Sequence, residues 1–191
     1  MIKQITFEQY RKIDLGIWIV IVVIFEMIAT MASTKWFSAQ PVTLSITVAM
    51  VCVLMLRWSH FSILHALAGG VAYCLASGAT MEQFIIYCIG NTAAMIGLGV
   101  IKLWGKEEIR TNSFKRMIFA LIVYAGTVLG RWLVSLMFQG TLEALIVYFT
   151  TDIVSLLFAV LVLMILSNSE GMIEDQKHYL LRLDKEKRES M

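Results

Sequence analysis

Residues 15–37 read LGIWIVIVVIFEMIATMASTKWF, and this stretch decides the fold class. A helix needs roughly 20 predominantly apolar residues to cross the ~30 Å hydrocarbon core of a bilayer. The stretch is longer than the ~7–15 residue core of a signal peptide, and a polar lead, MIKQITFEQYRKID, precedes it. It therefore predicts a membrane-spanning helix rather than a cleavable signal.

Five further apolar segments follow along the chain, at residues 42–58, 60–78, 83–103, 114–138 and 142–167. The whole chain is 59% hydrophobic and 16% charged, whereas soluble domains are about 45–50% apolar and about 25% charged. The pattern predicts an all-α integral membrane protein with six transmembrane helices. Only residues 57–60 separate the second and third segments, so a re-entrant pair is an alternative there.

The basic residues indicate which side of the membrane each loop faces, because Lys and Arg accumulate in cytoplasmic loops. Of the 16 Lys and Arg residues, all but Lys35 and Arg131 fall on one side of a six-span arrangement. That side holds Lys3, Arg11, Lys12, Arg57, Lys102, Lys106, Arg110, Lys115, Arg116, Lys177, Arg182, Lys185, Lys187 and Arg188. We therefore predict that both termini are cytoplasmic, because an odd number of spans would place either the lead or the tail on the wrong side.

Two parts are expected: a six-helix transmembrane domain over residues 1–168 and a cytoplasmic tail over residues 169–191. The tail is too polar to cross a membrane. Its apolar residues alternate with charges, as in an amphipathic helix: Ile173, Tyr179, Leu180, Leu181 and Leu183. Two roles stay open for this helix. It can lie solvated at the membrane surface, or it can dock a cytoplasmic partner.

Polar residues within the apolar segments are the candidates for function, because they are costly inside a membrane. At 1.5 Å per residue, Asp152 lies ~15 Å from the outer start of the sixth segment, and Arg131 lies ~10 Å from the outer end of the fifth. The same arithmetic brings Glu26 and Asn91 to a similar depth. We therefore expect these four side chains, from four helices, to share one layer in the outer half of the bilayer.

Two interpretations of this layer stay open. Arg131 can pair with Asp152 and tie two helices together, because buried charges are nearly always paired. Alternatively, the layer forms the floor of a solute pocket that opens to the outside, with nearby aromatic side chains on its walls. The second interpretation predicts a binding site formed by Glu26, Tyr87, Asn91, Arg131, Trp132, Tyr148 and Asp152.

Catalysis is not expected from this sequence. It contains no HExxH, GxSxG or P-loop motif. His60 and His65 are five residues apart, which is a poor spacing for a metal pair on a helix, and the three cysteines have no CxxC spacing. The net charge of +2 is too small to indicate nucleic-acid binding. No cofactor is expected. Solute binding remains, and the alternative is a non-transport membrane scaffold subunit of a larger complex.

A family resemblance supports solute binding and covers nearly the whole chain. It lies in the size, the six predicted spans and the order of these strings: PVTLSITVAMVCVLMLRW, HFSILHALAGGVAYCLASGAT, FIIYCIGNTAAMIGLGV, GRWLVSLMF, FTTDIVSLLFAVLVLMI and EGMIEDQKHYLLRLDKEK. In this pattern the chain resembles the substrate-binding S components of energy-coupling factor (ECF) transporters, and its polar ending resembles those of an uncharacterised branch.

The resemblance implies capture of a micronutrient, usually a vitamin, at the outer face of a prokaryotic plasma membrane. It also implies a membrane coupling (T) subunit and two cytoplasmic ATPase subunits as partners, and toppling of the S component in the bilayer. Many members carry small residues four apart in helix 1 for docking. Here the inner half of the first segment, LGIWIVIVVI, offers only Gly16, so Gly69, Gly70 and Ala72 are expected to provide small surfaces instead.

The charges of the layer suggest the chemistry of the solute. Two carboxylates, Glu26 and Asp152, accompany one permanent cation, Arg131. The carboxylate that Arg131 leaves over can be protonated, can face water, or can bind a cationic group of the solute. The last option predicts a cationic or zwitterionic ring-containing solute, and a Glu26→Gln change that weakens binding but hardly alters stability. A protonated Glu26 bonded to its own helix or to Asn91 is the alternative.

Overall fold

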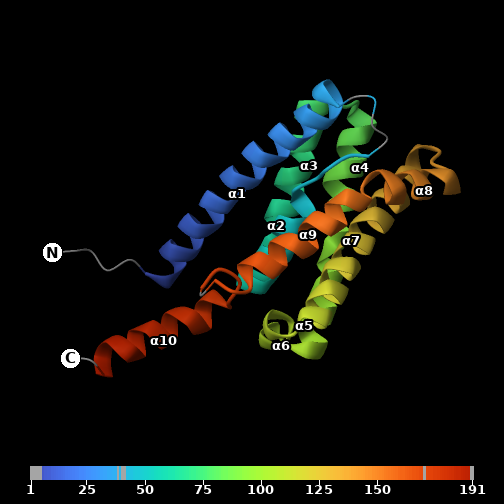
Figure 1. The fold of residues 1–191 in the computed structure, drawn as a ribbon. Helices are drawn as coiled ribbons and strands as arrows, with labels where there is room; N and C mark the ends of the chain where they lie inside the picture. Colours follow the sequence, from blue (N-terminus) through green and yellow to red (C-terminus); the bar gives the residue numbers. More distant parts are fainter. Residues whose placement is uncertain (1–5, 38, 40–41, 170, 190–191) are drawn as a thin grey trace.

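The structure, a computed structural model, describes residues 6–37, 39, 42–169 and 171–189. These residues form helices joined by short connections, and no strand is found among them (Figure 1). The elements are α1 (Phe7–Met31), the π-helical turn η1 (Ala32–Trp36), α2 (Thr47–Trp58), η2 (Ser59–Ser62), α3 (Ile63–Ser77), α4 (Met81–Asn91), η3 (Thr92–Ile96), α5 (Gly97–Trp104), α6 (Lys106–Thr111), α7 (Ser113–Ser135), η4 (Leu136–Phe138), α8 (Leu142–Thr151), α9 (Ile153–Leu166) and α10 (Gln176–Glu189).

Several of these helices are long and apolar enough to cross a membrane. By length and composition alone, four helical stretches within the described residues qualify: Phe7–Trp36, Thr47–Ser77, Met81–Trp104 and Ser113–Phe138. Helices α8 and α9, which meet at a bend of 44°, make a fifth if they are taken as one span. The predicted all-helical fold is confirmed, whereas the number of six spans stays a prediction.

The stretch Thr47–Ser77 is folded back on itself. Ser59, which follows α2, has a positive φ of 54°, and Gly69 of α3 lies so close to Thr47 of α2 that an added Cβ would be 2.0 Å from its Oγ1. Helices α2 and α3 therefore lie side by side, as the two sequence segments predict. With 12 and 15 residues, they are only ~18 and ~22 Å long. Two short crossings and a re-entrant pair both remain compatible with these lengths.

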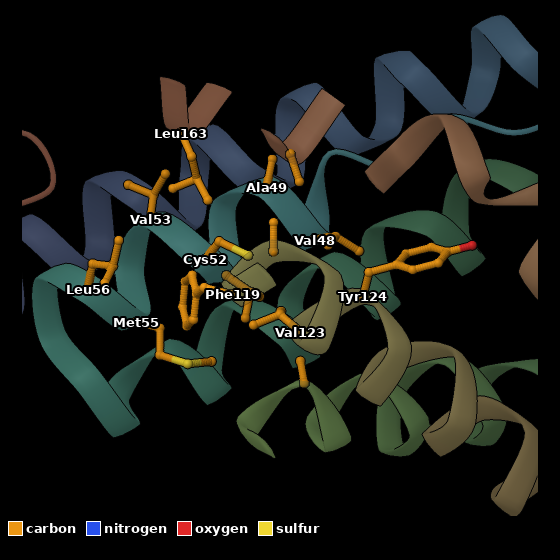
Figure 2. Close-up of a cluster of buried hydrophobic side chains, with 14 of the residues drawn as sticks. Val48, Ala49, Cys52, Val53, Met55, Leu56, Phe119, Val123, Tyr124 and Leu163 are labelled. Atoms are coloured by element: carbon orange, nitrogen blue, oxygen red, sulfur yellow. The ribbon is translucent and has the colours of Figure 1, made fainter. Parts of the chain in front are cut away.

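Helix α2 is the centre of the bundle, and each of its twelve residues is buried. Figure 2 shows its Cys52 and Met55 among Phe119 and Val123 of α7, with Leu163 of α9 on the other side. Helix α1, in contrast, exposes a row of large apolar side chains to the outside. An apolar outer face on a helix with few buried residues is what lipid contact requires. The row includes Ile13, Ile17, Val20, Ile24 and Ile28.

Glycines allow neighbouring helices to approach closely. A Cβ on Gly70 would lie 2.9 Å from the backbone oxygen of Tyr87, and Ala72 is buried. Together with Gly69, these residues pack inside the bundle and offer no outer surface, so the expectation that they replace the missing docking motif of helix 1 is wrong. Helices α4 and α7 meet in the same way, because a Cβ on Gly130 would lie 2.2 Å from the Gly90 oxygen.

Replacing Gly130 by alanine is expected to lower stability by about 1–3 kcal/mol, because overpacking forces the α4 and α7 backbones apart. The control is Gly99→Ala, where no atom lies within 4 Å of the added Cβ. Alanine there should stabilise the helix by up to ~1 kcal/mol. Thermal unfolding of the purified protein in detergent measures both changes. Equal effects of the two variants would contradict the close contact.

Charged residues predicted to be cytoplasmic lie together at the end of the bundle where the tail begins, which we call the tail end. Arg57 forms two hydrogen bonds of 2.8 Å to Asp14, and its Nη1 donates to the Gly171 oxygen at 2.5 Å. Lys106 donates to Asp175 at 2.5 Å. Figure 1 shows α6 and α10 at this end and the last turn of α1 at the opposite end. Lys3 lies outside the described residues.

The tail contains the predicted helix, α10, but the bundle holds mainly its start. Ile173, which precedes α10, is buried, and Gln176 accepts a hydrogen bond of 3.2 Å from the Tyr10 hydroxyl. Further along, Leu181 is 61% exposed. The side chain of Leu183 lies outside the described residues. The tail is therefore anchored through residues 171–176, and the helix extends beyond that anchor (Figure 1).

The anchor is expected to be released in acid. Burial alone would raise the pKa of Asp175, but the hydrogen bond and charge of Lys106, together with backbone amides, hold that pKa below its usual value. A lowered carboxyl pKa stabilises the folded form above the unfolded pKa of ~3.9, and this contribution is lost as the pH falls through the lower folded pKa. A nitroxide attached at position 177 should be immobile at pH 7 and become mobile below about pH 4. In an Asp175→Asn variant it should already be more mobile at pH 7 than in the wild type.

Candidate functional site

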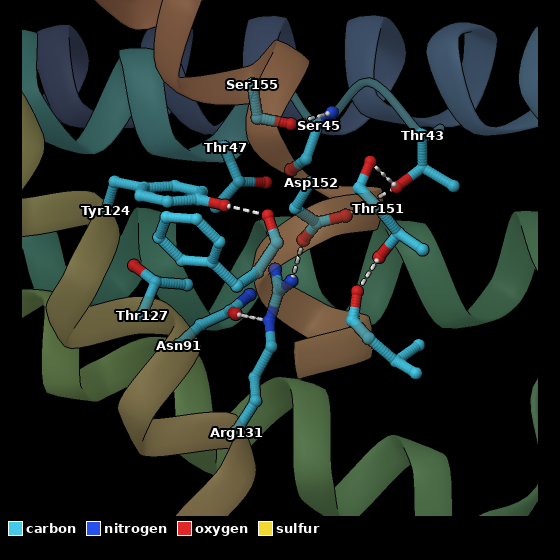
Figure 3. Close-up of polar contacts among 12 residues, drawn as sticks. Thr43, Ser45, Thr47, Asn91, Tyr124, Thr127, Arg131, Thr151, Asp152 and Ser155 are labelled. Carbon is cyan, nitrogen blue, oxygen red and sulfur yellow. Dashed lines mark hydrogen bonds and ion pairs between the residues drawn. The ribbon is translucent and has the colours of Figure 1, made fainter. Parts of the chain in front are cut away.

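Arg131 is the centre of the predicted polar layer. It projects from the interior of α7 and is 2% exposed. Its Nε donates to Asn91 Oδ1 of α4 at 2.7 Å, and its Nη1 forms an ion pair with Asp152. The guanidinium carbon lies 4.5 Å from the centre of the Tyr87 ring, which is a cation–π distance. Figure 3 shows the side chains of Asn91, Arg131 and Asp152 converging. Three of the four side chains expected in one layer therefore meet, and Arg131 pairs with Asp152 as one of the two interpretations requires.

Asp152 lies at the break between α8 and α9, where the backbone leaves helical geometry. One carboxylate oxygen accepts from Arg131, and the other accepts from the Thr43 hydroxyl. The Thr43 amide donates to the Thr151 oxygen at 2.8 Å. The break thus holds the non-helical segment 42–46 that leads into α2. Sequence analysis missed Thr43, because a hydroxyl residue beside an apolar run carries no distinctive signal.

Tyrosine rings cover one side of Arg131. Tyr87 stacks on Tyr73 of α3 with ring centres 4.3 Å apart, and Tyr148 of α8 meets Tyr87 edge to face at 6.3 Å. Tyr87 and Tyr148 were predicted, and Tyr73 was missed. Trp132 is placed elsewhere: its indole nitrogen donates to the Thr141 oxygen at the start of α8, at 3.2 Å. It therefore belongs to the α7–α8 connection rather than to the tyrosine group.

Glu26 of α1 is completely buried, and it caps α2 rather than meeting Asn91. Its Oε2 accepts from the amides of Ile46 and Thr47 at 2.7 and 2.8 Å, and from the Thr47 hydroxyl at 2.9 Å. These amides are among the four that a helix N-terminus leaves without partners. The Asn91 amide group instead donates to the Ala66 oxygen. The predicted alternative of a Glu26–Asn91 hydrogen bond is therefore wrong.

A cavity of about 290 Å³ lies beside this layer, at the end of the bundle opposite the tail end. It lies between the last turns of α1, the segment that leads into α2, and α9. Its lining residues are mostly small or apolar: Ala29, Ala32, Ser33, Phe37, Val42, Thr43, Leu44 and Val154. Thr43 joins the two features, because it lines the cavity and its hydroxyl donates to Asp152. The volume is close to the lower limit for small-molecule sites, ~300 Å³.

Two other cavities lie away from the polar layer. One, of about 490 Å³, lies between the α5–α6 turn and the tail, and its charged residues include the Lys106–Asp175 pair. The other, of about 390 Å³, is an apolar space between α7 and α8, lined by residues such as Ala125 and Leu145.

A scan against protein-family models, a search of curated proteins and a search of solved structures each found no match to this chain.

Proposed function

We propose that this chain is the substrate-capture (S) subunit of an ECF-type transporter for micronutrient uptake, in a prokaryotic plasma membrane. The observation that carries the proposal is the link through Thr43 between the cavity and the buried Arg131–Asp152 pair. Intramembrane charges are retained mainly where they serve a solute or ion pathway. In this proposal the solute enters the cavity from outside, and its polar groups reach Thr43 and the network behind it.

The proposed topology has six spans with both termini in the cytoplasm. The clustering of Asp14, Arg57, Lys106 and Asp175 at the tail end supports this topology, because cytoplasmic loops are rich in basic residues. The cavity then opens toward the outside. Energy for transport comes from two cytoplasmic ATPase subunits through a membrane coupling subunit, so this chain needs no nucleotide site.

The topology predicts where reporters become accessible. A reporter fused after Glu107 or at the C-terminus is expected in the cytoplasm, because both positions follow an even number of spans. One inserted between Gln139 and Gly140 is expected outside. A cysteine within each reporter is labelled with a membrane-impermeant reagent. Comparing the labelling of intact cells with that of lysed cells measures which side of the membrane the reporter faces. Labelling of the C-terminus from outside would contradict the six-span topology and the depths that follow from it.

The proposed solute is small, ring-containing, and cationic or zwitterionic. Its size follows from the cavity of about 290 Å³, and Phe37 and the neighbouring apolar side chains favour a ring. Its charge follows from the excess of carboxylates. The layer contains the two carboxylates of Glu26 and Asp152, and Arg131 neutralises only that of Asp152. An anionic solute bound through Arg131 would contradict this part of the proposal.

Mass spectrometry of the purified protein tests the proposed function. Wild-type protein in mild detergent should carry a small molecule. Ala29→Phe, which fills the cavity, should lose it. Ala125→Phe, which fills the apolar space between α7 and α8, is the matched control and should retain it. A wild-type protein without any bound solute, or a solute that persists in Ala29→Phe, would overturn the proposal, and the first outcome would favour a non-transport scaffold subunit.

A further inference from the structure

The cavity of about 290 Å³ has few polar groups on its walls. Among the described residues that line it, only Ser33 and Thr43 have polar side chains. A hydroxyl group has one proton to donate and two lone pairs that can accept. A solute in the cavity therefore meets whichever of these the protein leaves unused.

Both hydroxyl protons are used within the protein. Ser33 Oγ lies 3.0 Å from the Thr30 carbonyl oxygen, and Thr43 Oγ1 forms a hydrogen bond with the Asp152 carboxylate. This carboxylate is charged, because it pairs with Arg131. Carbonyl and carboxylate oxygens only accept, so the hydroxyl is the donor in each bond. Ser33 and Thr43 thus offer lone pairs to the cavity and no proton.

The backbone of the segment 42–46 adds acceptors to the same wall. Its amides at Thr43, Ser45 and Ile46 each donate to a group within the protein. In contrast, no described residue donates a hydrogen bond to the carbonyl oxygens of residues 42–44, which line the cavity. Non-helical backbone at membrane depth is tolerated where it lines a cavity. These carbonyl oxygens therefore remain available to a donor inside the cavity.

Partial negative charges on this wall favour a cation. Thr43 donates to Asp152, and a hydroxyl that donates to a carboxylate becomes a stronger acceptor. The ring of Phe37, which also lines the cavity, can contact a cation through its face. An aromatic face binds quaternary ammonium ions as well as protonated amines. Selection between these two classes therefore depends on the oxygen acceptors, which require an N–H group.

We propose that the solute presents a cationic N–H group, as in a protonated amine or amidine, to the oxygens of Ser33 and Thr43. A quaternary ammonium ion has the charge but no proton to donate, and a carboxylate offers only lone pairs to a wall of lone pairs. Both are therefore bound weakly. This chemistry deepens the proposed uptake function and rests on it, because that function identifies the cavity as the solute site. It specifies the hydrogen-bonding group of the solute, which the count of carboxylates leaves open.

Two probes of equal charge test the N–H requirement: benzylammonium, which has N–H groups, and benzyltrimethylammonium, which has none. Each is titrated into the dialysed full-length protein in detergent, and the concentration that half-saturates the rise in melting temperature is measured. Wild-type protein should bind benzylammonium roughly tenfold more tightly or better, since a hydrogen bond to a charged group has about that effect. Thr43→Val keeps the volume of the side chain but removes the acceptor, so it should weaken only benzylammonium.

Ser77→Ala is the matched control. Like Ser33, Ser77 is half-buried and donates to a carbonyl oxygen of its own helical stretch, that of Cys74 at 3.4 Å, but it is not among the residues that line the cavity. This variant should bind both probes as the wild type does. Ser33→Ala provides a second test variant if Thr43→Val does not fold, and it should also weaken only benzylammonium.

Equal binding of the two probes would overturn the proposal, and so would unchanged benzylammonium binding in Thr43→Val. If neither probe binds, the molecule carried by the purified protein decides the question. A carried molecule with a cationic N–H group supports the proposal, whereas one without such a group overturns it and leaves the uptake function intact. Preference for benzylammonium in a protein that carries no molecule would retain the cavity chemistry and remove only the uptake function. A protein that binds neither probe and carries no molecule would overturn both.

Discussion

Asp152→Asn is expected to lower the stability of the folded protein by about 3–5 kcal/mol, because it leaves Arg131 as an unpaired buried charge. Arg131 would keep its hydrogen bond to Asn91 and its contact with the Tyr87 ring, and neither provides a compensating negative charge. Unfolding in detergent, followed by tryptophan fluorescence, measures the loss. Thr43→Val is the control, because it removes only one hydroxyl hydrogen bond from the same carboxylate and should cost about 1 kcal/mol.

The double variant Arg131→Met/Asp152→Leu separates the two interpretations of the pair. Replacing both partners of a buried ion pair by apolar residues is often neutral or stabilising. We therefore expect the double variant to regain most of the stability that Asp152→Asn loses. If the pair serves solute binding, this stable protein should purify without the bound molecule. Normal solute binding by the double variant would show that the pair only ties α7 to the α8–α9 break.

Counting residues along helices predicted the core of the site. Arg131, Asp152 and Asn91 were placed in one layer because the rise of an α-helix is fixed, so sequence position within a span gives depth. The contacts of Arg131 with the other two confirm that these three side chains meet, whereas their depth in a bilayer stays a prediction. The method depends only on where each apolar segment begins and ends. For this reason the method succeeded for helices with clear ends. It gave no information about the direction of a side chain, and the side chain of Trp132 points to the α7–α8 connection.

The segment before α2 explains most of what sequence analysis missed. An apolar run from residue 42 predicted a helix there, but α2 begins at Thr47, and residues 42–46 are not helical. Non-helical backbone at membrane depth must find its hydrogen bonds inside the protein. The Thr151 oxygen, Glu26 and Ser155 provide them, the last by accepting from the Ser45 amide at 2.8 Å. Hydroxyl groups cost little within a span, so no sequence signal distinguished Ser155 in advance, whereas its charge marked Glu26 as a candidate.

The late start of α2 also gives Glu26 a role that sequence could not reveal. The first amides of a helix have no partner within that helix, and here they lie in the buried interior. A carboxylate from a neighbouring helix can accept from them and is favoured by the positive end of the α2 dipole. Glu26 satisfies two amides and one hydroxyl with a single oxygen. Its structural role therefore exists before any solute or ion is considered.

The Glu26→Leu variant is expected to lose several kcal/mol of stability, because the Ile46 and Thr47 amides lose their buried acceptor at about 1–3 kcal/mol each. Glu26→Gln keeps an oxygen but removes the charge, and should cost about 1.5 kcal/mol or more, since hydrogen bonds to charged groups contribute ~1.5–3 kcal/mol. This replaces the expectation from sequence that Glu26→Gln hardly alters stability.

Hydrogen exchange shows which amides lose protection when the Glu26 carboxylate is removed. In Glu26→Leu, the amides of Ile46 and Thr47 should exchange much faster than in the wild type, while amides in the middle of α7 should change only with global stability. Glu143→Gln, an exposed glutamate in the first turn of α8, is the matched control and should leave both stability and exchange nearly unchanged. The variant removes only the Glu26 carboxylate. Unchanged protection of Ile46 and Thr47 in Glu26→Leu would therefore show that this carboxylate does not cap α2.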